Sequence, residues 1–299
     1  MYEKILVPLD GSELAEVALP YAEELAGRLG SEGTLLYVSE SAEGQYHRIP
    51  QFYMQEMAKA TKRGAERYLE KPEGKAIKVE SAVLFGHPTD EIVAYADKED
   101  IGLIVMATHG RSGIKRLALG SVAEKIVRTA KQPVALIRAK GARPEVREKG
   151  MLNKALVPLD GSKESEAAIP YIEELASKLK GEVVLLQVVA QAYRVIHGGG
   201  DGSAQIPYTE EEMEPLRASA GDYLKTVAGG LEGKGITTRS EVRVGTAADE
   251  IIKLADELYV DMVAMSTHGR SGVSRWAFGS VADKVLHAGN TPLLLVRVS

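Results

Sequence analysis

Two segments of the chain combine glycines with a histidine, an arginine and a serine in one fixed spacing. The preceding apolar run reads as a strand and the following residues as a helix, so unpaired backbone N–H groups and the positive end of a helix dipole gather in one small volume. Glycine lets the main chain approach a phosphate without interference from a Cβ atom. Each segment therefore predicts an anion site: MATHGRSG from Met106 to Gly113 with Gly120-Ser121-Val122, and MSTHGRSG from Met265 to Gly272 with Gly279-Ser280-Val281.

The polar side chains of these segments extend the same prediction. Ser121 and Ser280 can cap their helices or donate a hydroxyl to a phosphate oxygen. Arg111 and Arg270 can add charge-assisted hydrogen bonds to an anion. The pattern leaves open a plain helix start without a ligand.

An aspartate ends the first apolar run of each half, in KILVPLD at Asp10 and in KALVPLD at Asp160. In a doubly wound sheet the loops after strands one and four face each other, so each aspartate meets a glycine segment. A carboxylate opposite an anion site suits a ribose, and Val38 and Val188 would flank a flat base, so the implied ligand is a nucleotide. The alternative is an Asp-Gly turn whose carboxylate bonds nearby backbone.

His109 and His268 invite a metal or catalytic interpretation. The chain has six histidines and no cysteine, so we expect the histidines to orient the loop or touch a phosphate instead, with no metal bound. The HGRSG run also differs from the G-x-S-x-G motif of hydrolases, because no residue separates its serine from its second glycine.

An internal repeat positions these residues twice. The segments Lys4 to Gly30 and Lys154 to Lys180 match at 17 of 27 positions with an offset of 150, and Met106 to Arg138 matches Met265 to Arg297 at 17 positions with an offset of 159. The second half therefore has nine extra residues, which we place in a mobile loop around His197 to Gly202.

Strand-like apolar runs alternate with helical periods in each half, which predicts α/β domains with parallel sheets covered on both faces. We expect domains over 1–139 and 154–299 with a linker over 140–153, and each domain to be a doubly wound, five-stranded, Rossmann-like fold. The first half predicts strands over 4–9, 34–38, 76–84, 102–107 and 133–138, and helices over 13–29, 53–70, 88–98 and 119–130. Ser12 and Ser162 stand at helix N-caps.

Composition excludes several classes of protein. A net charge of -5 and a pI near 5.8 disfavour a nucleic-acid partner. The absence of cysteine excludes disulfides, and no apolar run approaches the length of a membrane span. We expect a cytoplasmic protein.

On these residues the chain resembles the universal stress protein family, whose nucleotide-binding members carry G-x2-G-x9-G-[ST] after the fourth strand. The spacing from Gly110 to Gly120-Ser121 and from Gly269 to Gly279-Ser280 matches, whereas Ala107 and Ser266 replace the family's first glycine. The resemblance implies an adenine nucleotide, ATP, ADP or AMP, in each half. Its implied contacts are Pro8, Leu9, Asp10, Val38, Met106, Ala107, His109, Gly110, Arg111, Gly113, Gly120, Ser121 and Val122, then Pro158, Leu159, Asp160, Val188, Met265, Ser266, His268, Gly269, Arg270, Gly272, Gly279, Ser280 and Val281.

Three functions fit the sequence. The leading one is a nucleotide-dependent stress-response regulator that shows a partner protein a different surface when ATP is bound. The second is a slow ATPase using Mg²⁺, and the third is a partner-binding scaffold without nucleotide. In the resembled family the apolar last strands pair across a dimer, so we expect PVALIR and PLLLVR to pair within this chain, and a further homodimer stays open.

Overall fold

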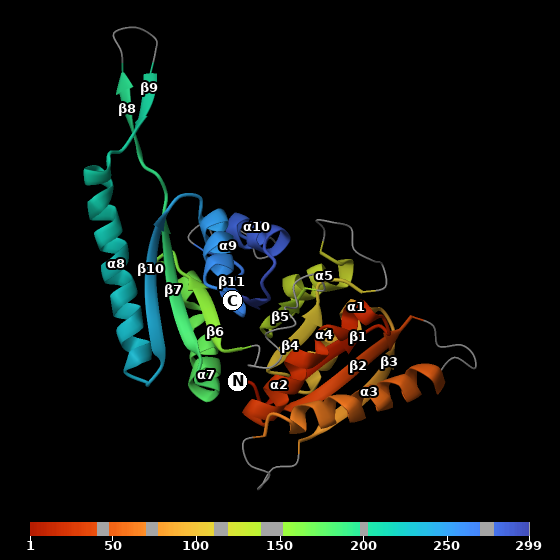
Figure 1. Cartoon of the computed structure of the whole chain (residues 1–299). Coiled ribbons are helices and arrows are strands. Elements are labelled where there is room, and N and C mark those ends of the chain that lie inside the picture. The colour runs from red at the N-terminus through yellow and green to blue at the C-terminus, as the bar shows by residue number, and fades with distance from the viewer. Residues whose placement is uncertain are drawn as a thin grey trace.

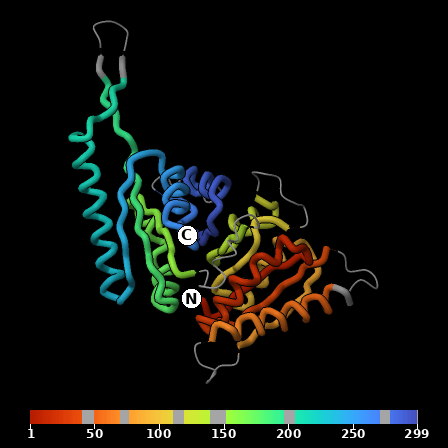
Figure 2. Tube along the Cα trace, in the orientation of Figure 1, coloured from red at the N-terminus to blue at the C-terminus, as the bar shows by residue number. Residues whose placement is uncertain are grey.

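The computed structural model describes seven stretches of the chain. These are residues 1–40, 48–69, 77–110, 119–138, 152–197, 203–269 and 278–298. The first half of the chain, red to yellow in Figure 2, lies beside the second half, green to blue.

The first half forms a five-stranded parallel sheet in the order β3-β2-β1-β4-β5. β1, β4 and β5 are apolar and almost wholly buried, as strands covered on both faces must be. The strands are β1 (Lys4–Leu9), β2 (Glu32–Ser39), β3 (Val79–Phe85), β4 (Leu103–Ala107) and β5 (Val134–Ile137).

Helices cover both faces of this sheet. Ile5 and Val7 of β1 pack in one buried cluster with α2 and α3, whereas Leu6 packs in a second cluster with α4 and α5. This alternation confirms the doubly wound fold. The helices are α1 (Glu13–Glu16), α2 (Leu19–Leu29), α3 (Arg48–Glu66), α4 (Pro88–Lys98) and α5 (Ser121–Thr129).

The second half repeats this plan in the order β10-β7-β6-β11-β12. Its strands are β6 (Lys154–Pro158), β7 (Glu182–Val189), β10 (Thr237–Val244), β11 (Met262–Ser266) and β12 (Leu293–Val296). Its helices are α6 (Lys163–Glu166), α7 (Ile169–Leu179), α8 (Glu210–Glu232), α9 (Ala247–Glu257) and α10 (Ser280–Ala288).

The second half also contains an antiparallel hairpin, β8 (Tyr193–His197) and β9 (Ser203–Pro207), where the sequence predicted a mobile loop. The hairpin extends away from the body of the protein beyond the start of α8 (Figure 1). Residues 198–202 lie outside the described residues. Of the predicted loop only His197 is described, and it is the last residue of β8.

The last strands of the two halves join the sheets. β12 pairs with β5 in the antiparallel direction, with Leu294 opposite Ala135, so the ten strands form one sheet. The predicted pairing of these strands is therefore observed, and each strand covers the hydrogen-bonding side of the other apolar strand. Because the pairing is antiparallel, the carboxyl ends of the parallel strands in the two halves point to opposite edges of the sheet.

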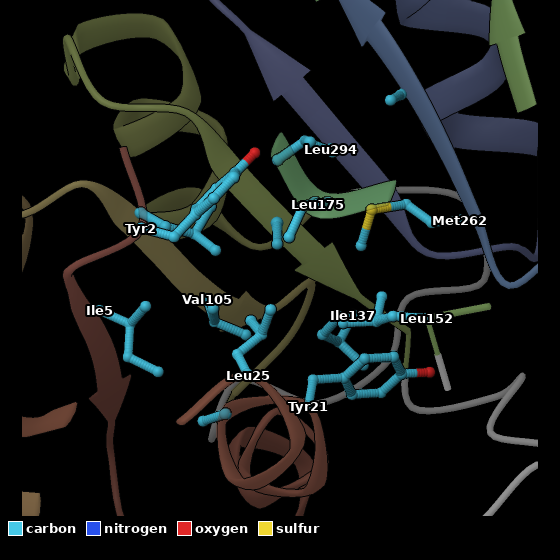
Figure 3. Packing of buried hydrophobic residues seen from close by; sticks show 14 of the residues in the cluster. Tyr2, Ile5, Tyr21, Leu25, Val105, Ile137, Leu152, Leu175, Met262 and Leu294 are labelled. Carbon is cyan, nitrogen blue, oxygen red and sulfur yellow. The ribbon is translucent and has the colours of Figure 1, made fainter. Parts of the chain in front are cut away.

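The buried core is shared between the halves. Figure 3 shows Tyr21 and Ile137 of the first half in the same cluster as Leu175, Met262 and Leu294 of the second half. All five side chains are buried. The apolar core therefore continues from one half of the chain into the other.

Two equivalent arginines also link the halves. Arg138 follows β5 and donates hydrogen bonds to the carbonyl oxygens of Val285 and Leu286 in the last turn of α10. Arg297 follows β12 and donates to the carbonyl oxygen of Thr129, the last residue of α5, at 3.0 Å. Each half therefore supplies a cation to the negative end of a helix in the other. Burial lowers the pKa of Arg138.

Helix boundaries differ from the predicted ones in three places, one of which is the helix predicted over 119–130, which spans 121–129. The single helix predicted over 13–29 is two helices, α1 and α2, separated at Val17 and Ala18, with Pro20 in the first turn of α2. Proline has no N–H to continue the preceding helix, and the same break precedes α7. The helix predicted over 53–70 spans 48–66.

Most of the predicted linker over 140–153 lies outside the described residues. Its last two residues are packed, since Leu152 is buried in the shared core and Asn153 accepts a hydrogen bond from Arg28 at 3.2 Å. The carboxylate of Asp261 accepts from the backbone N–H groups of Asn153 and Lys154 at 2.9 and 2.8 Å. It thereby fixes the start of β6 beside β11.

We predict that Asp261→Ala lowers the free energy of unfolding by about 2 kcal/mol, because two backbone donors lose their acceptor.

Burial raises the pKa of Asp261 although the two N–H groups act in the opposite direction. The folded state thus holds the proton more tightly than the unfolded state, and ionisation disfavours folding. The wild type should lose stability relative to Asp261→Asn as the pH rises above the ordinary pKa of an aspartate, about 4. Urea unfolding at several pH values measures both effects, and an Ala variant as stable as the wild type would contradict the first.

Candidate functional site

A cavity of about 490 Å³ lies at the carboxyl ends of β1, β2 and β4 and the start of α5. Every described residue that the sequence predicted for the first site lines it. They are Pro8, Leu9, Asp10, Val38, Met106, Ala107, His109, Gly110, Gly120, Ser121 and Val122. Arg111 and Gly113 lie outside the described residues.

An equivalent cavity of about 210 Å³ lies in the second half. The predicted residues that line it are Pro158, Leu159, Asp160, Val188, Met265, Ser266, His268, Gly269, Gly279, Ser280 and Val281. Arg270 and Gly272 lie outside the described residues. Because the two sheets run in opposite directions, the two cavities open at opposite edges of the ten-stranded sheet.

The aspartate of each cavity holds a tight turn with one of its oxygens. Oδ1 of Asp10 accepts from the backbone N–H of Ser12 at 3.0 Å and from its hydroxyl at 2.6 Å. Oδ1 of Asp160 accepts from Ser162 at 2.9 and 2.5 Å. Gly11, between Asp10 and Ser12, has a φ of 80°, which favours glycine. The local-turn alternative is thus correct for Oδ1.

The serines of these turns are helix N-caps, as predicted. Ser12 accepts a hydrogen bond from the N–H of Ala15, and Ser162 accepts one from the N–H of Ser165. The aspartate, the serine and the first turn of the helix therefore form one connected set of hydrogen bonds.

The second oxygen of each aspartate faces the glycine loop after the fourth strand. A Cβ atom on Gly110 would lie 2.1 Å from Oδ2 of Asp10, and one on Gly269 would lie 2.4 Å from Oδ2 of Asp160. A Cβ atom at either glycine would therefore displace the carboxylate from this position. The two loops lie against each other as the sequence predicts.

One alternative predicted from the sequence is that Ser121 caps its helix, and the structure shows a different N-cap at the start of α5. Gly120, not Ser121, is the N-cap, and no side chain caps the helix. Gly120 donates its N–H to the carbonyl oxygen of Thr108 at 2.9 Å. α10 begins in the same way at Gly279. The serines are therefore first helical residues that line the cavities. In the described stretches neither cap glycine offers a side chain to the N–H groups of the first turn.

A threonine that the sequence prediction missed orients each histidine. Oγ1 of Thr108 lies 3.0 Å from Nδ1 of His109, and Oγ1 of Thr267 lies 3.1 Å from Nδ1 of His268. Both threonines are buried. Nε2 of His268 is also buried, and within the described part of the chain it has no hydrogen-bond partner.

The two cavities differ at three pairs of equivalent lining residues, one of which is Pro88 and Ala247. The other two pairs exchange an alanine for a serine. Ala15 and Ala107 line the first cavity, whereas Ser165 and Ser266 line the second at the equivalent positions. The Ser266 hydroxyl donates to the carbonyl oxygen of His268, and the Ser165 hydroxyl donates to that of Ser162 at 2.8 Å. Both hydroxyls therefore bond to main-chain carbonyl groups beside the second cavity.

Other lining residues had weaker signals in the sequence. Leu36 and Leu186 lie two residues before the predicted valines on the same strand face, and period two could have found them. Ile92 of α4 and Ile251 of α9 reach the cavities only through the fold. The further lining residues of the first cavity are Tyr37, Ser39, Glu40, Pro88, Thr108 and Ala123, and those of the second are Ala247, Thr267 and Ala282.

Two further observations bear on the class of protein. In the described stretches there is no group of three or more histidine, aspartate or glutamate side chains that could hold a metal ion. No helix in those stretches has the length and apolarity needed to cross a bilayer.

The paired cavities and doubly wound sheets define a protein of two tandem Rossmann-like α/β domains. The profile of the universal stress protein family matches residues 1–138 and 151–297. The chain belongs to the universal stress protein family, as a tandem member.

Three relatives illustrate the match. The universal stress protein MJ0531 of Methanocaldococcus jannaschii is 33% identical over 148 residues, which are 46% of this chain and 83% of that protein. The crystal structure of a universal stress protein from Archaeoglobus fulgidus covers 99% of both chains with a TM-score of 0.68 and 20% identity, which supports the shared fold. A universal stress protein solved in complex with cAMP is 22% identical over 46% of this chain and 98% of its own, with a TM-score of 0.35.

We predict that Gly110→Ala lowers the free energy of unfolding by about 1–2 kcal/mol, because Asp10 must move and lose its bonds to Ser12. The φ of Gly110 is not positive, so alanine adds no backbone strain. In an Asp10→Ala background the same change should cost nothing. Urea unfolding of the four proteins completes the cycle, and an equal cost in both backgrounds would show that the carboxylate is not the obstacle.

Proposed function

We propose that this protein binds an adenine nucleotide in each half, with ATP in the first cavity, and works as a nucleotide-dependent regulator in the stress response. The observation that supports this most is the placement of a carboxylate and an uncapped helix N-terminus around one apolar-walled cavity, twice in the chain. The proposed location is cytoplasmic, and the proposed readout is a changed surface for a partner protein.

The sugar and base would lie on the side of the first strand. Asp10 has one carboxylate oxygen committed to its turn and the other directed at the Gly110 loop. A ribose offers two hydroxyl donors to such a carboxylate. Val38, Leu36 and Ile92 supply apolar walls for the flat base.

The phosphates would lie at the start of α5. Its nine residues align their peptide dipoles, and its first turn has no side-chain cap. In the second cavity, α10 begins in the same way, and the buried Nε2 of His268 is a polar atom suited to a ligand oxygen. A buried polar group of this kind is normally hydrogen-bonded.

The two cavities are unequal in size. Ligand pockets typically have volumes of about 300–1,000 Å³, a range that includes the first cavity but not the second. We therefore expect ATP to bind more tightly in the first half.

Calorimetric titration with ATP, ADP, AMP and cAMP, each with and without Mg²⁺, tests the proposal, with denaturing mass spectrometry of protein purified without added ligand. We expect two adenine nucleotides per chain with unequal affinities. A chain that binds none of the four at millimolar concentration would overturn the proposed function.

We predict that Val38→Phe abolishes the first binding event and Val188→Phe abolishes the second, because a phenyl ring occupies the space of the base. Each valine lies at the carboxyl end of its strand and lines its cavity, so the ring enters existing space. Calorimetry of each variant should show one site instead of two. Val195→Phe, on the exposed hairpin, is the control and should keep both sites. If folded Val38→Phe still binds two nucleotides, the first cavity is not a nucleotide site.

A further inference from the structure

α5 connects the first cavity to the second half of the protein. Its first turn lines the first cavity, and its last turn carries Arg128. At about 1.5 Å per residue, its nine residues span about 13 Å. The guanidinium carbon of Arg128 lies 4.9 Å from the centre of the Phe278 ring, in the second half. This distance is within the range of a cation–π interaction.

Phe278 immediately precedes the start of α10, where the proposed function places the phosphates of the second cavity. The next residue, Gly279, is the N-cap of α10 and lines that cavity with Ser280. The ring also packs on the buried cluster that contains Val285 and Leu286 of α10. Phe278 is thus held on one side by the core and on the other by Arg128.

The last turn of α5 is itself firmly held. Arg128 forms a salt bridge with Glu124, one turn earlier, at 2.9 Å. Arg297 of the second half donates to the carbonyl oxygen of Thr129. A cation fixed in this way can fix the position of the ring that it contacts.

The repeat does not reproduce this contact in the opposite direction. The positions equivalent to Arg128 and Phe278 are His287 and Leu119, by the offset of 159. Nδ1 of His287 lies 2.8 Å from the carbonyl oxygen of Asp283 on its own helix. Among the described residues, the first cavity therefore has no cation–aromatic contact of this kind from the second half.

We propose that Arg128 of the first half is a positioning residue for the second cavity. By holding Phe278 it sets the N-terminal end of α10, so the affinity of the second cavity for the phosphates of ATP depends on the first half. This inference rests on the proposed function.

The test measures each cavity alone, with ATP and Mg²⁺ as the probe. Calorimetry in a Val38→Phe background measures the second cavity, and calorimetry in a Val188→Phe background measures the first. Arg128→Ala should raise the Kd of the second cavity about three- to tenfold and leave that of the first unchanged. Arg128→Lys, which keeps a cation, should restore part of the affinity.

Two further variants separate this role from a general structural one. Glu124→Gln removes the salt bridge that helps to fix Arg128 but keeps the guanidinium, so it should weaken the second cavity less than Arg128→Ala does. His287→Ala changes the equivalent position of the second half and should not alter the second Kd by more than about twofold. Phe278→Leu, which installs the residue of the first repeat, should weaken the second cavity as much as Arg128→Ala, and the double variant should be no weaker.

The possible results separate failure of the positioning role from failure of the proposed function. An unchanged second Kd in Arg128→Ala, or additive losses in the double variant, overturns the positioning role while the proposed function stands. Equal weakening of both cavities also overturns it, because the effect is then general. If the Val38→Phe protein binds no ATP but the Val188→Phe protein does, the inference fails together with the second site alone. Failure of both proteins and of the wild type to bind overturns the proposed function itself.

Discussion

The antiparallel pairing of β5 with β12 is the interaction on which the rest of the structure depends. A parallel five-stranded sheet with an apolar last strand cannot leave that edge in water, and each half here covers the edge of the other. The pairing turns two sheets into one and places the two cavities at opposite edges. It also brings the end of each half near a helix C-terminus of the other, where Arg138 and Arg297 donate to the last carbonyl groups.

Much of this fold could be predicted from the sequence, because the apolar runs of a buried parallel sheet and the glycine loops are local signals. β1 spans the predicted residues, and the described site residues gather in two cavities. The features that local sequence patterns could not predict depend on tertiary contacts. Gly120 rather than Ser121 is the N-cap because the chain turns back to Thr108, and Ile92 reaches the cavity only because α4 packs on that face.

The two halves keep one plan but differ in how their loops are held. The second cavity gains hydroxyl groups at Ser165 and Ser266, and both bond to main-chain carbonyl groups of their own loops. It also receives Phe278, which Arg128 of the other half contacts. The arginine contacts to helix ends run in both directions, whereas the contact between Arg128 and Phe278 is made at the second cavity. Duplication gave the chain two copies of a site, and divergence of a few side chains made them unequal.

The edge-to-edge joining of the two sheets also determines where the chain can be circularly permuted. β5 ends and β6 begins at the same sheet edge, three strand spacings or about 14 Å apart. β12 ends and β1 begins at the opposite edge with the same separation, and both termini lie between the two halves (Figure 1). A circular permutant that links the termini and opens the chain between β5 and β6 would exchange the order of the halves while keeping every strand beside its present neighbours.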